Sequence, residues 1–122
     1  MYKVAFYRDK NGEEPVKKYV KDLLCERNYN KESRVRLNKI QDYIKVLQEK
    51  GTFAGEPYVK YMGDEIWELR PLKERVFFFM WAGNTYILLH HYHKKTQKTP
   101  QRELVIARKR KKDYEERMKA HE

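Results

Sequence analysis

The chain has 122 residues with a formal net charge of +10, and 38% of its residues are charged. A hydrophobic share of 40% is enough for one modest core, so we predict a single domain over residues 1–122. No run approaches the roughly 20 apolar residues of a membrane-spanning helix, and the one cysteine, Cys25, excludes an internal disulfide. The charge favours a polyanionic partner such as nucleic acid. We expect a cytoplasmic protein without a membrane partner.

The first half of the chain predicts one strand and two helices. Residues 2–8 (YKVAFYR) are rich in strand-forming residue types, and the polar segment after them indicates a turn. Pro15 suits the first position of a helix, and apolar residues recur at helical spacing over residues 16–24. A second apolar stripe predicts a helix over residues 33–50, which Gly51 ends.

The second half predicts a strand-rich region followed by a helix. Four short segments have the composition of strands, and tight-turn pairs at residues 63–64 and 83–84 each join two of them. Pro100 opens the last helix, whose apolar stripe is regular only in its first half. The predicted strands cover residues 58–62, 65–70, 74–82 and 84–93.

This order of elements predicts an α+β fold. A small antiparallel β-sheet would pack on two N-terminal helices, and a C-terminal helix would follow the sheet. We expect the helices to lie mainly on one face of the sheet. The other face would then be free to carry a site.

Three histidines gather in the segment HHYHKKTQKTP, residues 90–100. On a strand, His91 and His93 share one face, while His90 and Tyr92 share the other. A zinc site needs at least a third protein ligand, and the neighbouring lysines repel a cation, so we predict no metal and no cofactor. Hydrogen-bonded structural histidines and acid–base chemistry near neutral pH both remain open.

A carboxylate and two guanidinium groups form a second candidate site. Glu68 and Arg70 are two apart in EIWELRP, so both point to one face of a strand. Trp67 and Leu69 point to the other face. Arg75 begins the next strand and can lie near Arg70 across the turn. Such a group either forms a surface ion pair or binds a phosphate, whose oxygens match the planar fork of arginine.

Basic residues concentrate towards the C-terminus. Lys94, Lys95 and Lys98 alternate with threonines in a loop that precedes a helix N-terminus, where anions are favoured. The helix then carries the run RKRKK, residues 108–112. That run is either a solvated helix face or a surface that follows a phosphate backbone.

The motifs WELRP, RVFFF, LLHHYHKKTQKTP and ELVIAR occur in this order along the chain. In these motifs the sequence resembles the RelE/ParE superfamily of toxins from bacterial type II toxin–antitoxin pairs, and within it the HigB-like, or phage Gp49-like, branch. The resemblance runs over essentially the whole chain and implies the RelE-like fold. It implies a ribosome-dependent mRNA endonuclease (an mRNA interferase) that inhibits translation. The implied partners are a helix-turn-helix, HigA-like antitoxin, mRNA on the ribosome, and operator DNA through the antitoxin.

The resemblance also implies roles for individual residues. Arg70 matches the arginine that ends the family's ELR strand, and Arg75 matches the arginine of the next strand that commonly binds phosphate, so both would bind the scissile phosphate. His93 matches an acid or base at the end of the last strand. Lys94 matches a basic residue of this branch, and Glu68 resembles a glutamate that acts as general base in some relatives. Cleavage would proceed by metal-independent attack of the RNA 2′-OH on the scissile phosphate. The predicted contacts with RNA or the ribosome are Lys95, Lys98, Arg108, Lys109, Arg110 and Lys111.

Two other functions remain open. ParE-like toxins share the fold but inhibit gyrase, so the fold alone does not settle the activity. A non-catalytic nucleic-acid-binding module would need only the positive charge and the aromatic residues. The carboxylate of Glu68 among the cations argues against simple binding, because binding alone does not need it.

Overall fold

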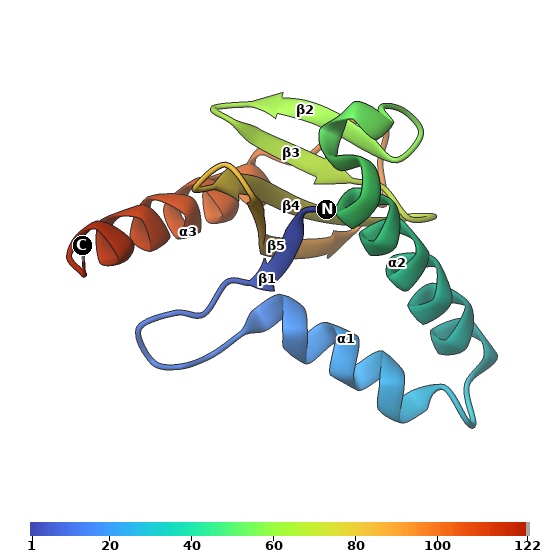
Figure 1. Ribbon diagram of the computed structural model, residues 1–122. Coiled ribbons are helices and arrows are strands. Elements are labelled where there is room, and N and C mark those ends of the chain that lie inside the picture. The colour runs from blue at the N-terminus through green and yellow to red at the C-terminus, as the bar shows by residue number, and fades with distance from the viewer. Residues whose placement is uncertain (122) are drawn as a thin grey trace.

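The computed structural model describes residues 1–121, and Figure 1 shows its strands and helices. The first half forms β1 (Lys3–Phe6), α1 (Pro15–Glu26), α2 (Lys31–Lys50) and the 3₁₀ turn η1 (Gly51–Ala54). The second half forms β2 (Val59–Gly63), β3 (Ile66–Leu69), β4 (Glu74–Trp81), β5 (Thr85–His93) and α3 (Gln101–Lys119). Every helix and strand predicted from the sequence is present, with ends displaced by at most two residues.

Local signals set the ends of the two N-terminal helices. Pro15 begins α1. The Asn30 side chain accepts a hydrogen bond from the Ser33 backbone N–H at 3.1 Å and so caps α2. Gly51 ends α2 with a φ of +61°, and a Cβ there would lie 2.6 Å from the Tyr86 hydroxyl. The end of α2 therefore passes close to β5, and only glycine fits there.

The five strands form one sheet in the order β1-β5-β4-β3-β2. Strands β2 to β5 are antiparallel neighbours, as predicted. Strand β1 instead pairs with β5 in parallel, from Lys3 opposite Thr85 to Phe6 opposite Leu88. The sheet is therefore mixed, which corrects the expectation of a wholly antiparallel sheet. The residues of β1 do not encode its partner, and no tight turn constrains its direction because two helices follow it.

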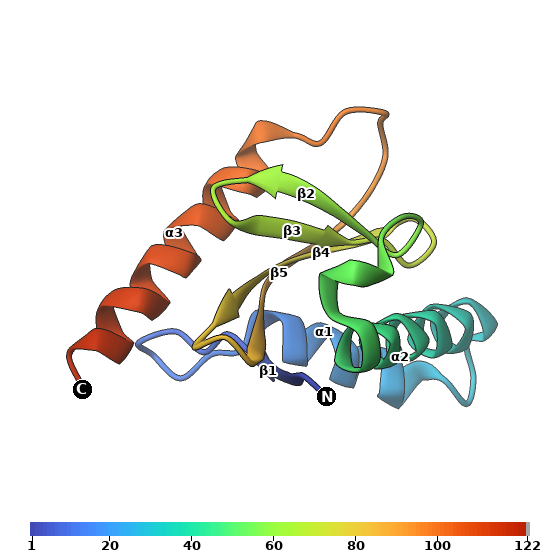
Figure 2. The same ribbon diagram turned by 45° about the horizontal axis from the view of Figure 1, so that its top comes forward.

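Helices cover both faces of the sheet (Figures 1 and 2). On one face α1 and α2 bury Val16 and Leu47, and on the other face α3 buries Leu104 and Ala107 beside Phe77. The sequence predicted a second face free of helices, and α3 covers part of it because the apolar first half of this helix needs a partner surface. Within residues 1–121, no helix combines the length and apolar character needed to cross a membrane.

A bulge in β5 decides which way its last side chains point. Phe77 lies opposite His90 and Phe78 lies opposite Leu88, so one residue of β5 between them has no partner. Beyond the bulge, strand alternation turns Tyr92 towards the face that carries α3 and His93 towards the face that carries α1 and α2.

Candidate active site

A buried carboxylate lies where β3, β4 and β5 run side by side. Glu68 on β3 exposes only 2% of its surface. Its Oε1 atom lies 3.4 Å from the Nε of Arg70 and 3.6 Å from the Nε of Arg75. The Tyr92 hydroxyl donates a hydrogen bond to Oε2 at 3.1 Å. A buried charge needs partners of this kind, and Glu68 has two cations and one hydrogen-bond donor.

Strand alternation brings these side chains to one face, as the sequence predicted for Glu68. Its neighbours Trp67 and Leu69 pack towards α1 and α2, so Glu68 points to the opposite face. Arg75 and Tyr92 are directly paired across β4 and β5 and share that face. The two arginines reach the same carboxylate oxygen, so the convergence expected from the sequence is present.

The two arginines are held differently. Arg75 is buried, and its Nη1 donates to the carbonyl oxygens of Leu72 and Glu74, each at 2.8 Å. Burial lowers the pKa of Arg75, and repulsion from Arg70 adds to this effect. Arg70 keeps 22% of its side chain exposed and lies 3.8 Å from Glu56. Arg75 therefore braces the turn between β3 and β4, whereas the Arg70 side chain stays partly exposed to solvent.

Two lysines add positive charge near Glu68. Lys60 on β2 is its direct cross-strand partner. Lys94 follows the last residue of β5, and partial burial lowers the pKa of its ammonium group, with repulsion from Arg75 and Arg70 lowering it further. Only the register of β2 and β3 shows that Lys60 accompanies Glu68, so the sequence alone does not reveal it. We call Glu68 with these four cations the Glu68 cluster.

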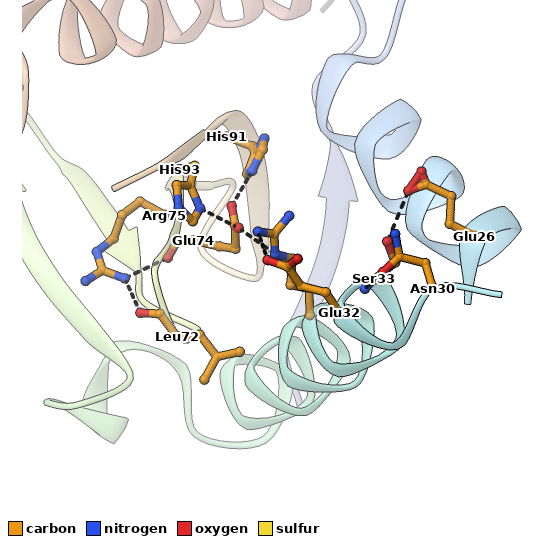
Figure 3. A network of polar contacts seen from close by, with 10 residues as sticks. Glu26, Asn30, Glu32, Ser33, Leu72, Glu74, Arg75, His91 and His93 are labelled. Carbon is orange, nitrogen blue, oxygen red and sulfur yellow. Dashed lines mark hydrogen bonds and ion pairs between the residues drawn. The ribbon is translucent and has the colours of Figure 1, made fainter. Parts of the chain in front are cut away.

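A second charged group lies on the opposite face of the sheet (Figure 3). Glu74, at the start of β4, accepts hydrogen bonds from His91 Nε2 at 2.7 Å and His93 Nδ1 at 2.8 Å. The Nε of Arg36 in α2 lies 3.4 Å from the same carboxylate, and the ring of Tyr19 in α1 stacks on His91. Burial alone raises the pKa of Glu74, but the two histidine hydrogen bonds outweigh it and bring the pKa to about 2. We call these five residues the Glu74 cluster.

The histidines divide between the faces as alternation predicted. His91 and His93 share one face, and His90 lies on the other, where a carboxylate of α3 holds it. The sequence grouped His93 with Glu68, but the structure bonds its ring to Glu74 on the α1–α2 face. Glu74 was missed, because a glutamate at the start of a strand is a weak signal until the opposite strand is known. Among residues 1–121, no group of three or more His, Cys, Asp or Glu side chains is placed to hold a metal ion.

The predicted basic loop encloses a hollow at the end of β5. The loop and the first residues of α3 surround a volume of about 600 Å³. Tyr92 and His93 both line this hollow, although their rings point to opposite faces of the sheet. Lys95 and Lys98 line it from the loop and are exposed.

The basic run on α3 contains both exposed and packed side chains. Arg108 forms an ion pair with Asp64 at 2.8 Å, and Lys109 is exposed. Arg110 instead donates to a carbonyl oxygen of β5 at 2.9 Å, and the Lys111 ammonium lies 5.4 Å from the centroid of a buried phenylalanine ring. These last two side chains pack on the sheet, and the RNA contacts predicted for them stay a prediction.

The fold and the Glu68 cluster define a small basic α+β protein with a carboxylate at the centre of a cationic face. Residues 29–112 match the phage-derived Gp49-like family (DUF891). The chain belongs to this family, which is part of the RelE/HigB-like toxin superfamily of toxin–antitoxin systems. No curated protein matches the chain. The family match confirms the resemblance and indicates a toxin with an antitoxin partner.

Proposed function

We propose that this chain is an endoribonuclease, the ribosome-dependent mRNA interferase of a type II toxin–antitoxin pair. The observation that carries the proposal is the Glu68 cluster, in which four cationic side chains accompany one buried carboxylate. A protein that only binds nucleic acid gains nothing from a carboxylate there. Cleavage of RNA needs both kinds of group, because a base accepts a proton while cations stabilise the charge on the phosphate.

RNA supplies its own nucleophile for this reaction. The 2′-oxygen attacks the scissile phosphorus, and its proton passes to Glu68. The bond from phosphorus to the 5′-oxygen breaks, and an acid protonates the departing oxygen. The products are a 2′,3′-cyclic phosphate and a 5′-hydroxyl, so atoms and protons balance without a metal ion. The excess of cations around Glu68 also repels a divalent cation.

The two arginines would stabilise the developing charge on the phosphate. Within the described chain, the Nε atoms of Arg70 and Arg75 are buried without a hydrogen-bond partner. Unsatisfied buried donors are costly, and an anion in the cluster would relieve that cost. Arg70 has only loose contacts to Glu68 and Glu56, at 3.4 and 3.8 Å, so its fork can turn to a phosphate without breaking a strong bond.

Two side chains can protonate the 5′-oxygen. Lys94 is electrostatically coupled to Arg75, Arg70 and Glu68, and its lowered pKa makes the ammonium a better proton donor near neutral pH. His93 lies one residue earlier, at the rim of the hollow that Tyr92 also lines. An imidazole ring can both donate and accept a proton, which suits proton transfer.

The exposed cations outside the cluster would hold the RNA backbone or the ribosome. Lys95 and Lys98 supply positive charge at the hollow, and Arg108 and Lys109 supply it on α3. A HigA-like helix-turn-helix antitoxin would neutralise the toxin and connect it to operator DNA. A net charge of +10 suits an acidic surface on that partner.

A translation reaction with the purified protein tests the proposal. We expect messages to be cut on the ribosome, leaving a 5′-hydroxyl on the downstream fragment. Glu68→Gln should abolish cutting. Glu56→Gln is a matched control, because Glu56 contacts the same Arg70 but keeps 69% of its side chain exposed. Intact messages together with inhibited gyrase would identify a ParE-like toxin instead.

A further inference from the structure

The Glu74 cluster is a buried ion group that the chemistry proposed for Glu68 does not use. The Glu74 side chain keeps 3% of its surface exposed and is contacted from two elements, β5 and α2. His91 and His93 reach it from β5 (Figure 3). Arg36 reaches it from α2, and the Tyr19 ring of α1 stacks on His91. Because these contacts already fix the Glu74 carboxylate, it can hold a neighbouring side chain in one orientation.

The two histidines of this cluster bind Glu74 through different ring nitrogens, so a different nitrogen is left free in each. His91 uses Nε2 to bind Glu74, and its ring lies against Tyr19 with centroids 3.5 Å apart. His93 uses Nδ1, and 38% of its side chain is exposed. A carboxylate can only accept a hydrogen bond here, so the proton of the neutral His93 ring lies on Nδ1. Its Nε2 has no hydrogen-bond partner among residues 1–121 and is the free nitrogen.

We propose that Glu74 is a positioning residue that holds His93 in one orientation and one tautomer, with Nε2 directed outward to exchange a proton with RNA. This inference rests on the endoribonuclease activity proposed above. Glu74 touches no substrate itself and acts through His93.

The position of His93 supports a role for this residue at the edge of the proposed active site. Glu74 and Arg75 are neighbours on β4, so alternation sends their side chains to opposite faces. In the sequence, His93 lies between Tyr92 and Lys94. The Tyr92 hydroxyl donates a hydrogen bond to Glu68, and the Lys94 ammonium interacts electrostatically with Glu68. It also borders both the hollow after β5 and a second hollow between α2 and the β3–β4 turn. RNA that runs from the Glu68 cluster across the end of β5 would therefore pass its ring.

The proton transfer balances with Glu74 ionised throughout. The His93 imidazolium gives its Nε2 proton to the 5′-oxygen as the bond to phosphorus breaks. The ring is then neutral and keeps its remaining proton on Nδ1, towards Glu74. Glu68 holds the proton from the 2′-hydroxyl. Glu74 does not change its protonation state, because its pKa of about 2 lies far below neutral pH.

Nitrogen NMR of labelled protein tests the positioning without any substrate. We expect the neutral ring of His93 to be protonated on Nδ1 in the wild type. Glu74→Gln should remove this preference, because an amide can also donate to an unprotonated Nδ1. A mixture of tautomers in the wild type, or an unchanged tautomer in the variant, would overturn the proposal. If Glu74→Gln does not fold, Glu74→Asp keeps the charge but shortens its reach, and it should weaken the preference.

The rate of cleavage tests the catalytic part. Loss of a positioned general acid typically lowers the rate by about 10²–10⁴. Glu74→Gln should therefore lower kcat strongly and leave KM nearly unchanged, because Glu74 acts through His93 and does not touch RNA. Glu49→Gln, which makes the same change at an exposed position of α2, is the control and should leave kcat unchanged. An unchanged kcat in Glu74→Gln refutes the positioning role, whereas a wild type with the expected tautomer and no cleavage refutes the proposed activity instead.

Discussion

Replacing Arg70 by alanine separates catalysis from stability more cleanly than any other change in the Glu68 cluster. Arg75 would be a poor choice, because its guanidinium also donates to the carbonyl oxygens of Leu72 and Glu74 and holds the turn before β4. Among residues 1–121, the Arg70 side chain makes no such hydrogen bonds to the backbone. Its contacts are ion pairs with Glu68 at 3.4 Å and with the exposed Glu56 at 3.8 Å.

A catalytic role and a purely structural role of Arg70 predict effects of different size. Losing one donor that stabilises charge in the transition state typically lowers the rate by about 10²–10³, or roughly 3–4 kcal/mol. Losing a partly exposed ion pair changes the free energy of unfolding by only about 0–1 kcal/mol. After the substitution Glu68 still has Arg75 and the Tyr92 hydroxyl as partners, so the carboxylate is not left alone. We expect a large loss of cleavage with a small change in melting temperature.

The assay compares growth arrest, cleavage of ribosome-bound message and thermal melting for each variant. Arg70→Lys should fail almost as completely as Arg70→Ala, because an ammonium group cannot make two parallel hydrogen bonds to a phosphate. Arg27→Ala, which removes an exposed arginine at the end of α1, is the control and should leave cleavage unchanged. If Arg70→Ala still arrests growth and cuts messages at nearly the wild-type rate, the active site does not lie at the Glu68 cluster.

Three further predictions address the partner, the metal and the pH dependence. Expression of the chain alone should arrest growth, and co-expression of its antitoxin should restore growth; colonies of normal size without the antitoxin would contradict a toxin. Cleavage of a minimal RNA should continue in excess chelator, and elemental analysis that finds one zinc per chain would contradict metal-independent chemistry. The Glu74 carboxyl has a pKa lowered from 4.5 to about 2 in the folded state. It therefore contributes stability that is fully present above pH 4.5 and is lost as the pH falls towards 2, in total about 3 kcal/mol. Chemical denaturation across this range should show the loss in the wild type and a much smaller one in Glu74→Gln, and equal slopes would disprove the assignment.

Residue patterns were sufficient to predict the elements and the direction of several side chains. The alternation around Glu68 placed it opposite Trp67 and Leu69, and the structure has this arrangement. The same rule put His91 and His93 on one face, where both bind Glu74. These predictions succeed because side-chain direction along a single strand depends only on local backbone geometry.

Pairing between strands could not be predicted in the same way. Lys60 accompanies Glu68 only because β2 and β3 pair in one register. Glu74 meets two histidines because β4 begins opposite the end of β5. The parallel contact of β1 depends on the path of two helices rather than on any residue of the strand. Strand pairing and register depend on tertiary contacts, which cannot be predicted from the residue pattern of a single strand.

The alternation of two neighbouring residues explains how a sheet this small carries two buried carboxylates. Arg75 points to one face and belongs to the Glu68 cluster, while Glu74 points to the other and binds both histidines. Arg75 also donates to the backbone carbonyl of Glu74, so one peptide unit supports both clusters. On β5, Tyr92 and His93 repeat the division, with Tyr92 on Glu68 and His93 on Glu74. Each carboxylate therefore has its own partners on its own face of the sheet. The two clusters meet where β4 begins beside the end of β5, and the proposed proton donor, His93, lies there.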